Sequence, residues 1–110
     1  MPNDAEDRRE HPRAPNKPPL EVKVTAARTV SAIARDISKG GMLLEAEMAP
    51  PKIGSELQLK FRLPGEKERT LIRAAVVRHA PGGLFGVKFL RLAADQLAAL
   101  DRYVNAQLTD

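Results

Sequence analysis

Short segments in which hydrophobic and polar residues alternate occur along most of the chain. The alternation is clearest at 57–63, where Leu57, Leu59, Phe61 and Leu63 are separated by polar residues. A period of two is typical of a strand with one buried face. The same pattern, together with β-rich composition between turn-forming residues, predicts six strands. They cover residues 20–25, 29–37, 42–45, 57–63, 71–79 and 84–89.

The period changes near the C-terminus. From Ala93 onward, apolar residues recur every three or four positions, and one stripe contains Leu97, Leu100, Val104 and Leu108. This spacing predicts an amphipathic helix at 93–108. Asp95 is placed to cap its start.

Six short strands joined by connections rich in Gly and Pro are typical of a small all-β domain, either an antiparallel barrel or a sandwich. We expect the apolar stripe of the helix to pack over one open end. A chain of 110 residues is long enough for one modest core. A single domain is therefore expected at 20–110.

The segment before the first predicted strand has a different composition. Residues 1–19 contain five prolines, almost no apolar residues and charges of both signs. Proline fixes φ and removes a backbone donor, which disfavours both a helix and a central strand. We therefore predict a flexible N-terminal arm at 1–19.

Composition narrows the classes of function. The chain has no Cys, and its two histidines, His11 and His79, do not make a persuasive metal site. It has neither an apolar run long enough for a membrane span nor a secretory segment, so a cytoplasmic location is expected. We expect no catalytic residue, no metal and no cofactor. The net charge of +4 favours an anionic partner.

Two clusters of residues are candidates for ligand binding, and the first lies on the predicted arm. Arg8, Arg9 and Arg13 fall within six consecutive residues. Guanidinium groups match phosphate oxygens and the O6/N7 edge of guanine, and they stack on base faces. On a mobile arm they could wrap around a ligand and become ordered with it. Taken alone, the cluster could equally be a solvated run of charge.

The second cluster is the segment 36–41, at the end of a predicted strand. Asp36 can accept hydrogen bonds from guanine N1–H and its exocyclic amine, and Ser38 offers a hydroxyl. Gly40 and Gly41 permit positive φ and close approach of a ligand. Taken alone, Asp-x-Ser followed by Gly-Gly is also ordinary turn chemistry.

In their order and spacing, the two clusters resemble the PilZ family. Its signature is Arg-x-x-x-Arg on an N-terminal arm, followed by Asp/Asn-x-Ser-x-x-Gly on an early strand, and here these motifs occupy 9–13 and 36–41. Segments 53–57, 75–78 and 86–89 resemble its weaker motifs. The resemblance extends over roughly residues 8 to 104. It implies a six-stranded barrel with a C-terminal helix and a receptor for the second messenger cyclic di-GMP.

For the arm, the resemblance assigns roles to single residues. Arg9 and Arg13 are expected to grip phosphates and guanine edges. Arg8 stands where an arginine in the family tends to accompany two stacked ligand molecules, so two molecules of cyclic di-GMP per chain are expected.

For the barrel, the resemblance assigns guanine bonding to Asp36 and Ser38, and space for the ligand to Gly40 and Gly41. Many members of the family carry a base-stacking Trp near position 78, and this chain has no Trp. Arg78 is expected to stack in its place. Lys39 replaces a residue that is commonly apolar.

The leading hypothesis is therefore a non-catalytic sensor. Its arm changes conformation on binding cyclic di-GMP, and it signals to a downstream protein that the sequence does not identify. The alternative is a PilZ-fold interaction module that does not bind nucleotide, although intact signature residues argue against it. A barrel that binds single-stranded nucleic acid is disfavoured, because such barrels use aromatic stacking platforms and this chain has few aromatic residues.

Overall fold

The computed structural model describes residues 14–108 and the side chains of residues 20–107. It contains six strands and one helix. They are β1 (Ala14–Thr25), β2 (Thr29–Ile37), β3 (Gly41–Ala46), β4 (Glu56–Phe61), β5 (Thr70–Ala80), β6 (Leu84–Arg91) and α2 (Ala94–Leu108).

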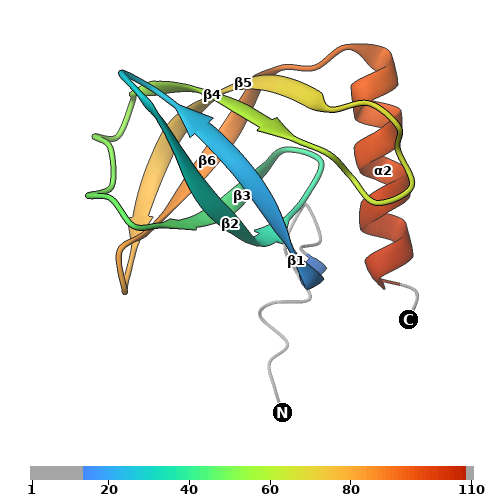
Figure 1. Cartoon of the computed structure of the whole chain (residues 1–110), viewed down its shortest axis with the longest axis horizontal. Coiled ribbons are helices and arrows are strands. Elements are labelled where there is room, and N and C mark those ends of the chain that lie inside the picture. The colour runs from blue at the N-terminus through green and yellow to red at the C-terminus, as the bar shows by residue number, and fades with distance from the viewer. Residues whose placement is uncertain (1–13, 109–110) are drawn as a thin grey trace.

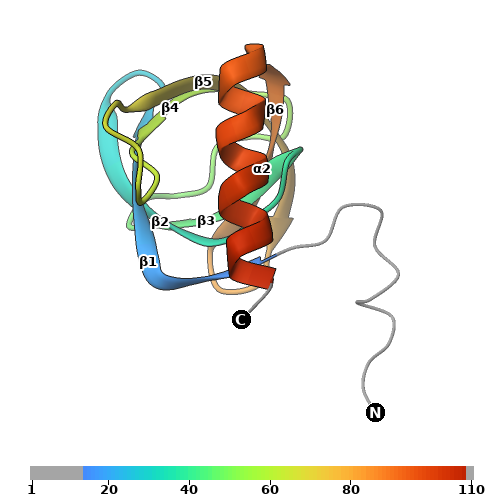
Figure 2. The same ribbon diagram turned by 90° about the vertical axis from the view of Figure 1, so that its right-hand side faces the viewer.

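The strands form a closed antiparallel barrel in the order β1-β2-β3-β6-β5-β4. Helix α2 stands at one end of this barrel (Figure 1). The view turned by 90° shows the helix lying across the barrel opening (Figure 2). The predictions of an all-β antiparallel barrel and of a C-terminal helix over one open end are confirmed.

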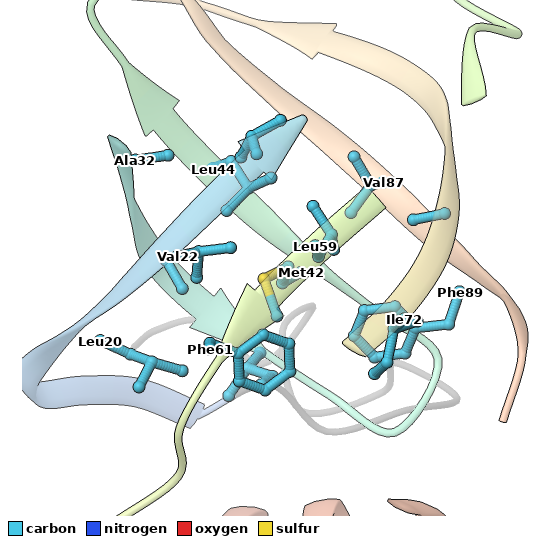
Figure 3. Close-up of a cluster of buried hydrophobic side chains, with 14 of the residues drawn as sticks. Leu20, Val22, Ala32, Met42, Leu44, Leu59, Phe61, Ile72, Val87 and Phe89 are labelled. Atoms are coloured by element: carbon cyan, nitrogen blue, oxygen red, sulfur yellow. The ribbon is translucent and has the colours of Figure 1, made fainter. Parts of the chain in front are cut away.

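Alternating residues of the strands fill the barrel interior. The burial pattern of β4 follows the predicted alternation, with Leu57, Leu59 and Phe61 buried and the residues between them exposed. Figure 3 shows side chains from several strands converging inside the barrel. Because aromatic residues are scarce, most of this core is aliphatic, and Phe85 is the largest side chain that is fully buried.

The buried face of α2 agrees with the predicted stripe at Leu100 and Val104 and departs from it at Leu97. Ala99, Leu100, Tyr103 and Val104 are buried, whereas Leu97 is 43% exposed. Periodicity alone does not choose between two neighbouring stripes on one helix, because both repeat at the same spacing.

The start of α2 also differs from expectation. The backbone N–H of Ala93 donates to Gln96 Oε1 at 3.0 Å, which is the glutamine half of a capping box. Gln96 Nε2 donates to the Leu71 carbonyl at 2.9 Å and so ties the first turn to β5. Asp95 lies in the first turn, where its charge favours the helix dipole.

Strand β1 begins at Ala14, whereas the predicted strand began at residue 20. Ala14 pairs with Ile37 and Pro15 with Asp36, and the register shifts between Pro15 and Leu20. Prolines are tolerated where pairing is irregular, which explains how this segment joins a strand despite its composition. In Figure 2 the strand bends at this point. Of the predicted arm, residues 1–13 lie outside the described residues.

Helix α2 is too short and too polar to cross a bilayer, and the part of the chain that the structure describes has no other α-helix.

Candidate functional site

The turn between β2 and β3 is built around Ser38. This side chain is buried, and its Oγ accepts the Gly40 N–H at 3.2 Å and lies 3.4 Å from the Gly41 carbonyl oxygen. The Ser38 N–H also donates to the Gly41 carbonyl, at 2.9 Å. Ser38 therefore holds the turn together, whatever contact it makes with a ligand.

The two glycines of this turn make close backbone contacts with β6. A Cβ on Gly41 would lie 2.0 Å from the carbonyl oxygen of Val87, because β3 and β6 approach closely there. The carbonyl of Gly40 accepts the Phe89 N–H at 2.9 Å. Neither glycine has positive φ. The positive φ that glycine permits is therefore not used here, and the space beside Gly41 is taken by β6.

One row of paired residues crosses the barrel beside this turn. Asp36 of β2 pairs with Leu43 of β3, Leu43 with Gly86 of β6, and Gly86 with Arg78 of β5. Ile37 and Met42, the neighbours of Asp36 and Leu43, are buried, so Asp36 and Leu43 lie on the outer face, because side chains alternate along a strand. Arg78 is also exposed, and its neighbours Val77 and His79 are exposed with it because the register of β5 shifts between Val76 and Arg78. The row therefore joins the acid of the second cluster to Arg78 across four strands.

Arg78 lies against the backbone of Gly86. A Cβ on Gly86 would be 3.1 Å from both Cγ and Nε of Arg78, so the missing side chain leaves room for the guanidinium arm to lie along the sheet. Arg78 is exposed. A planar guanidinium held flat on a surface can stack on an aromatic ring or a base.

The row continues into β1, because Pro15 pairs with Asp36 on the opposite edge of β2. The chain therefore enters the barrel directly beside the second cluster. Arg8, Arg9 and Arg13 themselves lie outside the described residues. The structure brings Asp36, Ser38, Gly40 and Gly41 together at one turn and places Arg78 on the same outer face.

Charged side chains surround this face. Arg35 pairs with Glu45 at 3.3 Å, and Lys39 in the turn pairs with Asp101 of α2 at 3.6 Å. All four side chains are roughly half exposed, so each pair contributes little to stability. The Lys39–Asp101 pair nevertheless connects the candidate site to the helix. Among the side chains that the structure describes, no group of three or more His, Asp and Glu is placed to hold a metal ion.

Sequence reasoning missed two residues of this face. Leu43 is half-buried between Asp36 and Gly86 and supplies the apolar part of the surface. The other is Gly86, which accommodates Arg78. The segment Met42-Leu43-Leu44 has no alternation of apolar and polar residues that would show which side chain points outward. The neighbours of Leu43 also depend on the strand order, which the sequence pattern does not reveal.

Comparisons with known proteins agree with this architecture. The family model described as the PilZ domain matches residues 7–106. No curated protein sequence matches the chain.

Several solved structures share the fold. The Bacillus subtilis inhibitor of motility, MotI/DgrA, superposes with a TM-score of 0.76 at 24% identity over 94% of this chain. The chain spans about half of that protein, 52% of its length. The PilZ domain of YcgR from Escherichia coli, solved with c-di-GMP, gives a TM-score of 0.72 at 20% identity, covering 93% of this chain and 92% of that domain.

A third similar structure is the PilZ domain of CeSA from a cellulose-synthesizing bacterium. It gives a TM-score of 0.63 at 22% identity, covering 89% of this chain and 98% of that domain. The family match extends over most of the chain, and the barrel, the C-terminal helix and the signature turn are those expected of it. The chain therefore belongs to the PilZ family.

Proposed function

We propose that this domain is a receptor for cyclic di-GMP that binds its ligand on the outer face of β2, β3, β6 and β5. The observation that carries the proposal is the row from Pro15 through Asp36, Leu43 and Gly86 to Arg78. In this row the entry of the N-terminal segment lies beside a carboxylate, and a surface guanidinium follows on the same face with β3 and β6 in between. The PilZ domain of YcgR, whose fold this chain shares, was solved with c-di-GMP.

The arginines before β1 can reach this face. Arg13 immediately precedes Ala14, which pairs with Ile37. Arg9 is five residues before Ala14, and an extended chain spans at most about 3.3–3.6 Å per residue, so its backbone lies within about 18 Å of Ala14. A segment of this length can fold over a nucleotide that rests on Leu43 and Arg78.

Each residue then has a chemical task in the proposal. Arg9 and Arg13 bind phosphate oxygens and guanine edges through forked, charge-assisted hydrogen bonds. Asp36 accepts from the N1–H and amine of a guanine, and Arg78 stacks on a base. Ser38 holds the turn that presents Asp36, and its hydroxyl has a further lone pair for the base.

Ligand binding would order the arginine segment against the barrel and so change the surface shown to another protein. A ligand that binds one arrangement better shifts the population toward it. The same reasoning extends to stoichiometry. Two stacked ligand molecules carry roughly four negative charges, and Arg8 adds a third cation to the segment to offset them.

Substitutions test the assignment. Arg13→Ala and Asp36→Ala should each weaken cyclic di-GMP binding by at least about 1.5 kcal/mol, the scale of a lost charged hydrogen bond. Isothermal titration calorimetry measures this change, and Lys52→Ala, on the β3–β4 connection, is a matched control that should bind like the parent protein. Unchanged affinity in Arg13→Ala would contradict the assignment. A loss of melting temperature would identify a structural residue instead.

A further inference from the structure

The strands of the barrel are not hydrogen-bonded to their neighbours over equal lengths. Strands β1 and β4 pair only at Lys23–Lys60, Val24–Leu59 and Thr25–Gln58. Continuing this register by two residues would place Glu21 opposite Arg62, yet the ladder stops before that point. Among the described residues, no backbone hydrogen bond joins Arg62 to β1. Figure 1 shows β1 and β4 diverging toward the end of the barrel that carries α2.

A groove lies along this open seam. Its volume is about 1400 Å³, which exceeds the range of about 300–1,000 Å³ typical of small-molecule pockets. Residues of β1 and β4 line it, and the β4–β5 connection at 62–69 borders it. The groove shares no lining residue with the row that runs from Pro15 through Asp36 to Arg78. It is therefore a second surface, separate from the proposed ligand site.

The groove is rich in basic side chains. Five cations line it: Lys23, Lys60, Arg62, Lys67 and Arg69. Its three acids are Glu21, Glu66 and Glu68, of which Glu66 already pairs with Arg102 and Glu21 with Lys23. Within the described part of the chain, Lys60, Arg62, Lys67 and Arg69 have no ion-pair partner. Leu71 adds an exposed apolar side chain to the same lining.

We propose that this seam binds an extended, acidic segment of a partner protein by strand addition. An unpaired strand edge offers backbone donors and acceptors to an incoming strand, and pockets for alternate side chains give specificity. The unpaired cations select acidic residues, and Leu71 provides a contact for an apolar one. A second copy of this chain would bring the same lysines and arginines to the seam, and like charges beside an edge oppose such pairing.

The geometry also favours protein over nucleic acid. Nucleic-acid grooves of this size rely on stacking of bases on aromatic rings, and Phe61, the aromatic residue of the lining, is buried in the core. Glu68 would in addition repel a continuous phosphate backbone. An acidic polypeptide can instead space its charges to avoid Glu68.

The probe is a short fluorescein-labelled peptide of alternating glutamate and valine, measured by fluorescence anisotropy against the full chain without cyclic di-GMP. We expect saturable binding that Lys60→Glu with Arg62→Glu weakens by at least about tenfold, because charge-assisted contacts become repulsive. The matched control, Lys52→Glu with Arg91→Glu, changes the same charge away from the groove and should stay within about twofold. If Lys60→Glu with Arg62→Glu lowers the melting temperature, the test is repeated with Lys67→Glu and Arg69→Glu, which lie in the β4–β5 connection.

A second probe isolates the backbone contribution. The same peptide with N-methyl groups on alternate amides keeps its charge but cannot pair along one edge, and we expect it to bind at least about tenfold more weakly. Strand addition at the seam is overturned if the unmodified peptide does not bind, if N-methylation leaves affinity unchanged, or if an oligothymidylate of equal charge binds more tightly. None of these results depends on cyclic di-GMP binding, so the two proposals fail separately.

Discussion

At the scale of single residues, Gly41 and Gly86 show how an absent side chain can serve two purposes. Gly41 lets β3 approach β6, because a Cβ there would meet the Val87 carbonyl oxygen at 2.0 Å. Gly86 instead leaves room for another side chain, that of Arg78. Neither residue has positive φ. Glycine is therefore needed at both positions because of close contacts with neighbouring atoms, and the backbone conformation does not require it.

Substitution of Gly41 should therefore destabilise the barrel. Gly41→Ala forces two backbone segments apart, and overpacking of this kind costs about 3 kcal/mol. Gly65→Ala is the control, since Gly65 has φ +89 and open space around it, so it carries only conformational strain of about 1 kcal/mol. Chemical denaturation measures both. Equal losses in the two variants would contradict the steric explanation.

Substitution of Gly86 should instead affect the ligand. Gly86→Ala places a Cβ 3.1 Å from Cγ and Nε of Arg78 and so displaces that flexible side chain, at little cost to folding. We expect the affinity for cyclic di-GMP to fall about as far as in Arg78→Ala, by about 1 kcal/mol. The double variant should be no weaker than Arg78→Ala, because both changes remove one interaction. Additive losses in calorimetry would show that Gly86 acts independently of Arg78.

At the scale of elements, the strands follow from the sequence more closely than the helix does. Alternation in β4 predicts its buried residues, since only one face of a strand can enter the barrel. For α2, periodicity predicts the helix but not its rotation, and Leu97 is exposed while Tyr103 is buried. The contact of Gln96 with the Leu71 carbonyl links residues 25 positions apart, which no local pattern reveals.

The burial of Tyr103 has a consequence for alkaline stability. Loss of water around the phenol disfavours its anion and raises the pKa of Tyr103 above its ordinary value of 10.0. The folded protein thus keeps this proton to higher pH than the unfolded chain does. The resulting stabilisation is fully present below pH 10 and is lost as the pH rises through the folded-state pKa.

Tyr103→Phe removes the ionisable group and keeps the ring. The melting temperature of the parent should fall more steeply above about pH 10 than that of Tyr103→Phe, and the difference between the two proteins should be constant near neutrality. Differential scanning calorimetry over this pH range measures both curves. Parallel curves above pH 10 would show that Tyr103 does not contribute to alkaline unfolding.

At the scale of the whole molecule, the sequence predicts the barrel but not where its faces lie. The motifs indicate Asp36 and Arg78 separately, and only the strand order β2-β3-β6-β5 places them in one row. The open seam between β1 and β4 cannot be predicted from the sequence pattern either, because it depends on pairing between two strands that are distant in the sequence. The start of β1 at Ala14 was missed because prolines mask a strand whose pairing is irregular.

The molecule thus has two candidate surfaces on different strands, with α2 over one end of the barrel. The proposed nucleotide face contacts α2 through Lys39 and Asp101, and the seam does so through Glu66 and Arg102. In hydrogen exchange, we expect amides at 8–13 to become protected when ligand is added. Those of β4 should change little, because β4 is not part of the proposed face.

The central claim is tested most directly by calorimetric titration of the unmodified chain with cyclic di-GMP, with cyclic di-AMP as the matched control. The proposal predicts saturable binding of the guanine ligand at a ratio of two per chain, weaker binding of the adenine ligand, and an affinity that falls with added salt because the phosphate–arginine contacts are screened. A ratio of one would remove the stacked pair and leave the receptor assignment intact. Absence of saturable binding, or equal binding of cyclic di-AMP, would contradict the account.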